Sequence, residues 1–342
     1  MLHKKLAFAI WSLPGKNDWE GIAQNDSEVE KIGISNIKLV KGFITAPFDF
    51  NGEVNFIRPD INFNSKSFSL NSDLEEDKIV EIPVKETYII DREEYLESCG
   101  SLINAIKRGA AEKVVYSRVI SVPFDLKKLI CFYNKLVEEH ISAMVFMYFI
   151  DGDLWIGASP EIIIESDGVS FKSMALAGSK LAEDKSDWGE KEIVEQEFVS
   201  DYIENELIKH KVEYKKSEVK TIEAGPVAHL KTEFTGSFNN VEVSDIINAL
   251  HPTSAVCGIP KSDSKQLILT TEKHKRLDYT GFFGPVDMGK YNLFVNLRSA
   301  LISENRMQIF VGGGLTKDSI PEDEWNETVL KSKTLLLSYK KC

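Results

Sequence analysis

Residues 143–159 read AMVFMYFIDGDLWIGAS, two apolar, β-rich runs that are separated only by Asp151 and Gly152. Runs that are rich in aromatic and branched residues and joined by so short a link predict the two strands of a hairpin. A parallel pair would need a crossover of a dozen or more residues, so this pair is expected to be antiparallel. The hairpin therefore favours a sheet in which neighbouring strands run in opposite directions.

Further strands and helices are expected on both sides of this hairpin. Apolar residues recur with helical periodicity in some segments, and β-rich runs bounded by turn residues occur in others. The interleaving and the short links predict an α+β fold with a large, mainly antiparallel, sandwich-like β-sheet core flanked by helices. The expected strands are 112–122, 168–179, 291–302 and 306–314, and the expected helices are 91–108, with Asp91 as N-cap and Gly109 as stop, 126–139, 188–210, 243–250 and one from Pro321.

The chain is long enough, at 342 residues with 43% hydrophobic residues, to bury one large core or two ordinary ones. Residues 1–88 combine short β-rich runs with polar connections and show no chemistry. We interpret them as a β-rich N-terminal part that packs on the same fold. Residues 89–342, which contain the candidate site residues, are interpreted as the catalytic domain.

Charge and composition exclude several classes of function. A net charge of −12 argues against a nucleic-acid partner, because phosphate binding needs clustered Lys and Arg. No apolar run is long enough to span a membrane, and the opening residues lack the features of a signal peptide. The four cysteines have no C-x-x-C spacing, which argues against a zinc site and is typical of reduced thiols. We therefore expect a cytoplasmic protein.

Two acidic stripes are candidate metal ligands. Glu324 and Glu327 share one helix face with Lys331, and Glu192 and Glu195 share another. A charged stripe alone is typical of a solvated helix face, so neither stripe is decisive. Two helices that each present an E-x-x-E pair could nevertheless form an oxygen-rich site, and carboxylate oxygens suit Mg²⁺.

Glycine-rich segments offer candidate contacts to an anion. Gly312, Gly313 and Gly314 permit positive φ and a close approach of backbone N–H groups to a ligand oxygen. Gly178 and Ser179, in ALAGSK, could do the same. A tight turn explains each segment equally well, so both interpretations stay open.

Single polar residues stand within strongly β-patterned surroundings. Lys113 opens KVVYSR, Glu161 follows WIGASP, and Arg298 lies inside LFVNLRSAL. An uncompensated buried charge is costly, so Arg298 especially needs a carboxylate partner from the protein or from a substrate. A structural ion pair is the alternative for each. His251, in LHPTSAVCG, is either a site residue or a histidine whose hydrogen bonds its loop satisfies.

Taken together, these motifs resemble the chorismate-utilising enzymes, a family that includes isochorismate, salicylate, anthranilate and aminodeoxychorismate synthases. The resemblance covers about residues 90–340, and the order and spacing of the motifs carry it. They are KVVYSR (113–118), GASPE (157–161), ALAGS (175–179), EKEIVEQEFV (190–199), LHPTSAVCG (250–258), GFFGPV (281–286), FVNLRSAL (294–301), FVGGGL (310–315) and EWNETVLKSK (324–333).

The resemblance implies that water is the nucleophile. Family members that add water to the ring carry a lysine at the position of Lys113, whereas the ammonia-using members usually carry glutamine, and Leu176 agrees with the water-using branch. The implied activity is isochorismate synthase, an isomerase in which water attacks ring carbon 2 of chorismate and the carbon 4 hydroxyl leaves. Lys113 would be the general base and Glu161 the general acid, with its pKa raised by burial.

The remaining site residues would bind Mg²⁺ and the dianionic substrate. Glu195 and Glu327 would hold the metal, with Glu192 and Glu324 as ligands or supports. The expected substrate contacts are Gly178, Ser179, His251, Arg298, Gly312, Gly314 and Lys331. Some positions depart from the family pattern, namely Lys180–Asp184, Gln196, Ser254 and Asp287. These departures remove no proposed catalytic group.

Three alternatives remain open. A salicylate synthase would share Lys113, Glu161 and the metal carboxylates, and would go on to eliminate pyruvate. An ammonia-using anthranilate or aminodeoxychorismate synthase component is disfavoured by Lys113, and a non-catalytic chorismate-binding protein is disfavoured by the complete set of groups. The product would serve menaquinone or siderophore biosynthesis, and the family suggests a monomer.

Overall fold

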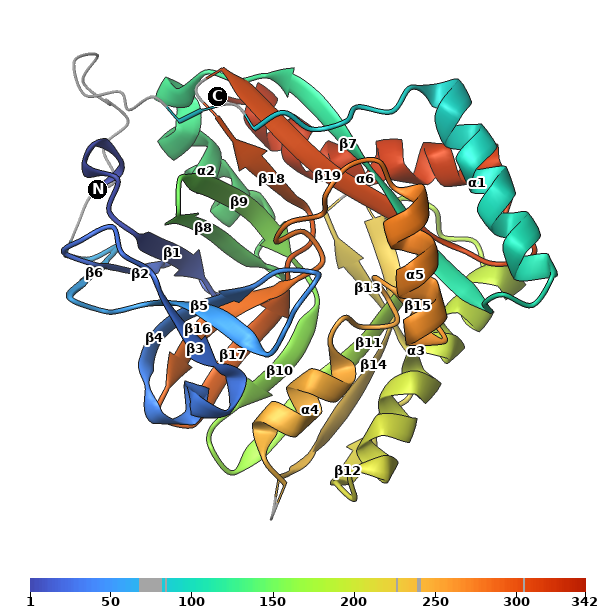
Figure 1. Ribbon diagram of the computed structural model, residues 1–342, viewed down its shortest axis with the longest axis horizontal. Coiled ribbons are helices and arrows are strands. Elements are labelled where there is room, and N and C mark those ends of the chain that lie inside the picture. The colour runs from blue at the N-terminus through green and yellow to red at the C-terminus, as the bar shows by residue number, and fades with distance from the viewer. Residues whose placement is uncertain (68–81, 84, 226, 239–240, 304) are drawn as a thin grey trace.

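The computed structural model describes residues 1–67, 82–83, 85–225, 227–238, 241–303 and 305–342. Within these residues the strands form two large sheets, one of nine strands and one of ten on its main path, and each recorded strand pair is antiparallel. The α+β class and the antiparallel core that the hairpin at 143–159 predicts are confirmed. Along the chain, runs of consecutive strands are separated by helices (Figure 1).

Sheet A contains the hairpin with which the sequence predicts the fold, and Tyr148 of one strand pairs with Trp155 of the next. In spatial order its strands are β15 (Gly258–Ile259), β7 (Lys113–Pro123), β19 (Arg306–Leu315), β18 (Ser299–Ile302), β9 (Asp153–Ser159), β8 (Met144–Ile150), β1 (Phe8–Ser12), β2 (Glu20–Ala23) and β6 (Ile61–Asn64).

Sheet B, like sheet A, includes strands from the N-terminal part of the chain. In spatial order its strands are β12 (Glu213–Lys216), β14 (Val227–Ser237), β11 (Ser170–Leu181), β10 (Ile162–Ser166), β17 (Lys290–Val295), β16 (Phe282–Asp287), β4 (Lys41–Ala46), β5 (Glu53–Ile57) and β3 (Glu30–Gly33), and β13 (Lys220–Ala224) pairs with β14. Strands from residues 1–67 thus enter both sheets; the domain boundary at residue 88 stays a prediction.

Two of the places where the chain passes between the sheets are neighbours. β9 of sheet A is followed by Pro160 and Glu161 before β10 begins in sheet B, and β17 of sheet B is followed by residues 296–298 before β18 begins in sheet A. β9 pairs with β18 and β10 pairs with β17, so the two crossings lie side by side. Glu161 and Arg298 are therefore held at the junction of the sheets.

The prediction of one continuous strand at 291–302 is wrong, because the chain crosses from sheet B to sheet A within it. Arg298 has a φ of +49°, which breaks the extended backbone and turns the chain toward sheet A. Ser299 then pairs with Gly157 instead of continuing along sheet B. No local feature of LFVNLRSAL signals the break, because the apolar pattern continues through it.

The predicted helices are confirmed, and one further helix was not predicted. Asp91 caps the first helix by accepting a hydrogen bond from the Glu94 N–H, and Pro321 occupies the first turn of the last helix. The α-helices are α1 (Arg92–Lys107), α2 (Leu129–Glu139), α3 (Glu190–Lys209), α4 (Val243–Leu250), α5 (Lys261–Thr271) and α6 (Pro321–Lys340), and short 3₁₀ helices span η1 (Leu2–Lys4), η2 (Ile34–Leu39) and η4 (Leu126–Lys128). α5 is the unpredicted helix, because only a few of its residues are apolar.

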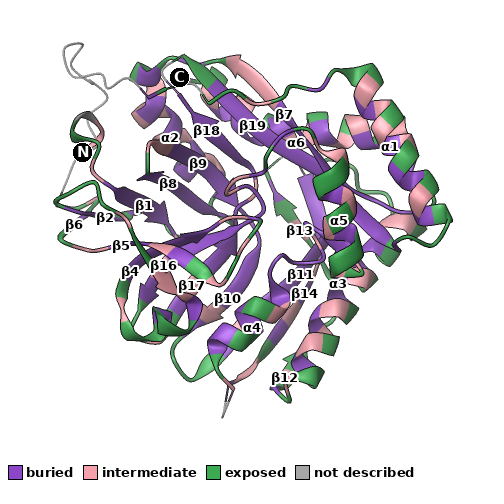
Figure 2. Ribbon diagram, viewed as in Figure 1, coloured by how far each residue is buried: buried purple, intermediate pink, exposed green. Residues whose placement is uncertain are grey.

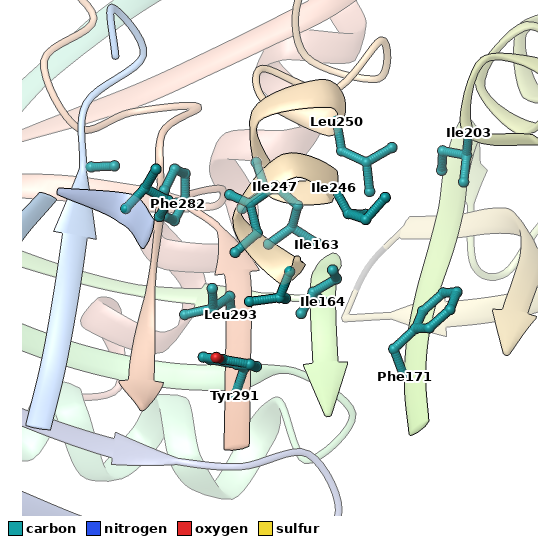
Figure 3. Packing of buried hydrophobic residues seen from close by; sticks show 14 of the residues in the cluster. Ile163, Ile164, Phe171, Ile203, Ile246, Ile247, Leu250, Phe282, Tyr291 and Leu293 are labelled. Carbon is teal, nitrogen blue, oxygen red and sulfur yellow. The ribbon is translucent and has the colours of Figure 1, made fainter. Parts of the chain in front are cut away.

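The hydrophobic core lies on the sheets and under the helices. Figure 3 shows Ile246, Ile247 and Leu250 of α4 beside Ile163 and Leu293 of sheet B. Figure 2 shows that buried residues fill the strands, whereas the outer faces of the helices are exposed. This burial fixes the helices that carry the acidic stripes against the strands, since α3 packs on β11 and α6 packs on β19.

The cysteines correct an expectation from the sequence. Cys131, in α2, forms a disulfide with Cys342, whereas Cys99 and Cys257 are free and buried. The expectation of four reduced thiols is therefore wrong for two of them, because the fold brings together residues that are 211 positions apart. Among the described helices, none is long and apolar enough to cross a membrane.

Candidate functional site

A cavity lies at the junction of the sheets, where the two crossings meet the ends of α3 and α6. Its lining includes Glu161 and Arg298 from the crossings, Glu195 from α3, and Lys331 from α6. Strand residues complete it, among them Gly178, Ser179, His229, Gly312 and Gly314. Most candidate residues named from the sequence thus converge on one cavity.

Glu161 is a buried carboxyl, only 2% exposed. Its Oε1 atom accepts a 3.0 Å hydrogen bond from Thr253 Oγ1. Burial raises the pKa of Glu161 to about 7, while the Thr253 hydrogen bond and the positive charges of Lys113 and Lys331 act in the opposite direction. A carboxyl with this pKa can donate a proton near neutral pH, as a general acid must.

Lys113 is the first residue of β7 and is fully buried. Its Nζ atom lies 3.1 Å from Glu195 Oε1, a contact with the distance of an ion pair but without hydrogen-bond geometry. Gly314 lies opposite, since a Cβ at this position would come within 2.8 Å of Lys113 Cε and 2.4 Å of Glu195 Oε1. The lysine is therefore held beside the cavity with Glu195 as its counter-ion.

The carboxylates of α6 are each paired with a lysine. Lys191 Nζ donates a 2.7 Å hydrogen bond to Glu324 Oε1, and Lys331 Nζ lies 2.6 Å from Glu327 Oε1. Burial and the neighbouring Glu327 raise the pKa of Glu324 to about 7. Burial also acts to raise the pKa of Glu327, but the Lys331 ammonium outweighs it and lowers that pKa. The repulsion between these two close carboxylates therefore mainly raises the pKa of Glu324.

Gly312, Gly313 and Gly314 lie inside strand β19, paired with Ser117, Tyr116 and Val115 of β7. None of these three glycines has a positive φ, so the conformational freedom that glycine permits is not used here. Their role here is space: a Cβ on Gly313 would come within 2.9 Å of Glu324 Oε2. Gly178, in the other glycine-rich segment, does have a positive φ of 69° and stands at a bulge between β11 and β14.

Arg298 is buried, and within the described part of the chain none of its hydrogen-bond partners is a carboxylate. It donates from Nη1 to Thr334 Oγ1 at 3.0 Å and from Nη2 to His229 Nε2 at 3.0 Å. Burial lowers the pKa of Arg298 to about 10, so the guanidinium keeps its charge. A buried cation beside a cavity can bind a substrate carboxylate.

His229 is a site residue that the sequence did not identify. Burial, followed by the charge of Arg298, lowers its pKa to about 3, so the ring is neutral. Because Nε2 accepts from Arg298, Nδ1 carries the proton and donates to the Gly178 carbonyl at 2.7 Å. His229 thus connects the cation to the glycine turn. The only sequence signal is its inward-facing position in VAHLKTEF of β14, and one histidine gives no pattern.

Five predicted residues are outside the cavity lining: Lys113, Glu324 and Glu327 lie against residues that line it, whereas His251 and Glu192 lie elsewhere. His251 packs against Phe50 and Phe282, and its Nε2 atom lies 3.2 Å from the Pro47 carbonyl, outside the residues that line the cavity. Its hydrogen bonds are thus satisfied by its own surroundings. The carboxylate of Glu192 lies near Gly189 at the start of α3, apart from the α6 carboxylates. The structure does not bring either residue to the cavity.

The carboxylates have the chemistry for a divalent metal but are not gathered around one. In the described part of the chain, no three His, Cys, Asp or Glu side chains form a ready metal site. Glu324 Oε2 is nevertheless buried without a hydrogen-bond partner, and Gly313 leaves space beside it. An unpaired anionic oxygen near Glu327 fits a hard cation such as Mg²⁺. The residues therefore fit the metal that the sequence implies.

Comparison with known proteins identifies relatives over most of the chain. The family described as chorismate binding enzyme matches residues 44–338. Isochorismate synthase MenF of Bacillus subtilis (strain 168) is 29% identical over 261 residues, which cover 72% of this chain and 55% of the relative. Isochorismate synthase EntC of Escherichia coli (strain K12) is 30% identical over 240 residues, which cover 66% of this chain and 61% of the relative.

The match with these curated relatives thus spans between 55% and 61% of their length. A solved structure of MenF, the menaquinone-specific isochorismate synthase from Escherichia coli, superposes with a TM-score of 0.79 and covers 97% of this chain and 88% of that one. Its sequence identity is 18%, so it supports the fold alone.

Proposed function

The chain belongs to the chorismate binding enzyme family, and we propose that it is an isochorismate synthase. One observation carries this proposal: Glu161, with a pKa of about 7, lines one cavity together with the Arg298 guanidinium, and the fully buried amine of Lys113 lies 3.1 Å from Glu195, which also lines that cavity. An acid, a base and an anion-binding cation are the groups that exchange of a ring hydroxyl on an anionic substrate requires.

In the proposed reaction, water adds to ring carbon 2 of chorismate and the hydroxyl on carbon 4 leaves. Glu161 donates a proton to the departing hydroxyl, so that water leaves instead of hydroxide. Lys113 accepts a proton from the attacking water. One water enters and one departs, so the reaction is an isomerisation and can run in both directions.

Lys113 can act as a base only as a neutral amine. The Glu195 carboxylate, 3.1 Å from its Nζ atom, faces the ammonium form, so Glu195 has to turn away before the lysine can accept a proton. Glu195 is also one of the carboxylates proposed to hold Mg²⁺.

The anionic groups of the substrate would be bound by cations and backbone N–H groups. Arg298, held by His229, would receive the enolpyruvyl carboxylate, and Lys331 with the Gly178–Ser179 turn would support the ring carboxylate. Glu195, Glu324 and Glu327, supported by Glu192, would hold Mg²⁺, which would supply a positive charge to neutralise that ring carboxylate. This arrangement supports an obligatory metal.

The test is to incubate purified protein with chorismate, with and without Mg²⁺, and to identify the products by chromatography and mass. Isochorismate that accumulates to an equilibrium mixture only with Mg²⁺ is the expected result. Salicylate with pyruvate would show a salicylate synthase, and aminated products with ammonium would show an ammonia-using synthase. Binding of chorismate without any product would contradict the proposal in favour of a non-catalytic protein.

The cellular setting remains part of this proposal. The names of relatives refer to both menaquinone and vibriobactin, a siderophore-type product, so the pathway stays open between the two predicted ones. The monomeric state and the cytoplasmic location stay predictions.

A further inference from the structure

Lys191 connects the two helices that carry the acidic stripes. It lies in the first turn of α3, beside Glu192, and its Nζ atom reaches Glu324 Oε1 of α6 at 2.7 Å. The Glu324 side chain is fully buried, whereas that of Lys191 is 29% exposed. The ammonium thus reaches from the surface into a buried carboxylate position on a different helix.

This contact differs from the other lysine contacts at the site. Lys331 pairs with Glu327 on its own helix and also donates to the Gly312 carbonyl at 2.9 Å, so it has a second partner if the carboxylate moves. Lys191 has Glu324 as its one recorded hydrogen-bond partner among the described residues. Its ammonium compensates the buried negative charge of the Glu324 carboxylate, whose other oxygen has no hydrogen-bond partner.

We propose that Lys191 is an intramolecular counter-cation that holds Glu324 while the protein is free of metal and leaves it when a divalent cation binds. The inference rests on the metal site of the proposed function. A divalent cation on the free Oε2 of Glu324 would lie beside the ammonium that Oε1 of the same carboxylate holds, so the two positive charges repel each other and compete for Glu324. The metal affinity is then reduced by the free energy of the Lys191 contact.

The same contact would also keep the site in shape without metal. Glu324 and Glu327 repel each other, and the ammonium from α3 offsets that repulsion while tethering α3 to α6. A neutral side chain of similar length should therefore weaken the metal-free protein and strengthen metal binding. These opposite effects distinguish competition from a simple structural role, in which both would weaken.

The first test compares Mg²⁺ binding to wild type, Lys191→Met and Lys191→Arg by titration calorimetry. Lys209→Met is the matched control, because Lys209 lies on the same helix but its side chain is 71% exposed and it pairs only with Glu206. We expect the Kd for Mg²⁺ to fall about 3- to 10-fold in Lys191→Met, since a competing charge is lost. Lys191→Arg and Lys209→Met should bind as wild type does, and the Tm without metal should fall only in Lys191→Met.

The second test uses the wild-type protein alone, so it does not depend on how a variant folds. Lysine acetylation by an amine-specific reagent is followed residue by residue with mass spectrometry, with and without Mg²⁺. Lys191 should become more reactive with Mg²⁺, whereas Lys209 should not change. Wild type that binds Mg²⁺ with no change at Lys191, or with the same Kd in Lys191→Met, would overturn the inference while leaving the metal site intact. Failure of every protein to bind Mg²⁺ would overturn both.

Discussion

Thr253 Oγ1 donates a 3.0 Å hydrogen bond to Oε1 of Glu161, the carboxyl at the crossing between the two sheets. Burial disfavours the ionised carboxylate, whereas this donor favours it, so the two effects act on the same pKa in opposite directions. Burial is the larger effect, and the pKa is raised to about 7. The loop that contains Thr253 thereby influences the pKa of Glu161, the general acid proposed for the reaction.

The first prediction concerns the pH dependence of turnover. A general acid has to be protonated, so kcat/KM should fall as the pH rises above about 7. Glu161→Gln cannot donate the proton and should lose activity by about 10²- to 10⁴-fold. Initial rates of isochorismate formation across about pH 5–9 would check this. An alkaline limb that persists in the residual activity of Glu161→Gln would contradict the assignment.

The raised pKa of Glu161 also determines how its contribution to the free energy of unfolding changes with pH. The folded-state pKa of Glu161 lies above the ordinary value of 4.5, so the folded protein holds its proton more tightly than the unfolded chain. Its contribution to the free energy of unfolding is complete below about pH 4.5 and is lost as the pH rises through about 7. Glu161→Gln should lack this part of the pH dependence in denaturant titrations.

Thr253→Val removes the hydrogen bond while keeping the shape of the side chain. Without the donor, the ionised form of Glu161 loses support, so the pKa should rise and the alkaline limb of kcat/KM should move to higher pH. Thr270→Val is a suitable control, since Thr270 is exposed and its hydroxyl bonds only within α5. A limb that moves to lower pH in Thr253→Val would show that the hydroxyl stabilises the neutral acid instead.

His229 is expected to act through Arg298. His229→Leu removes the acceptor for Arg298 and the donor to the Gly178 carbonyl, leaving two buried groups unpaired. The free energy of unfolding should fall by about 1–3 kcal/mol, and KM for chorismate should rise more than kcat falls. His229→Gln, which can still accept and donate, should recover part of the KM effect. Steady-state kinetics with His210→Leu, a partly exposed control at the end of α3, would check this.

Gly313→Ala tests whether the glycines of β19 provide space for the metal carboxylates. The added Cβ would come within 2.9 Å of Glu324 Oε2, the end of a side chain, so the carboxylate should move while the strand stays paired. We expect weaker Mg²⁺ binding in calorimetry with a nearly unchanged Tm. Gly100→Ala, in α1 with nothing within 4 Å of its Cβ, should bind Mg²⁺ normally and gain about 0.5–1 kcal/mol in stability. Equal Mg²⁺ affinity in both variants would contradict the role of Gly313.

The sequence predicted those parts of the fold that local patterns determine. The hairpin at 143–159 established the antiparallel sheet, and the cap at Asp91 and the proline at 321 located two helix starts. The break at Arg298 was missed because a strand can change sheets without any change in its apolar pattern. α5 was missed because its helical face is only weakly apolar.

The same contrast between local patterns and distant contacts applies to the site. Lys113 and Glu161 were named because their motifs resemble a family; Glu161 lines the cavity, and Lys113 lies behind it against Glu195. His229 and Lys191 were missed because their roles depend on partners that are distant in sequence: Arg298 for one and Glu324 for the other. A strand histidine or a helix lysine has no local feature that indicates such a partner.

The disulfide between Cys131 and Cys342 gives the last prediction. It ties the C-terminal residue, which follows α6, to α2, and it closes a loop of 211 residues. A crosslink over so long a loop restricts the unfolded chain, so Cys131→Ser should lower the free energy of unfolding by about 2–5 kcal/mol. Denaturant titrations without reductant would measure the loss. Adding a reductant should destabilise wild type to the level of Cys131→Ser and leave that variant unchanged, because Cys99 and Cys257 are free. Wild type whose four thiols all react with an alkylating reagent after unfolding without reductant would show that the bond does not form.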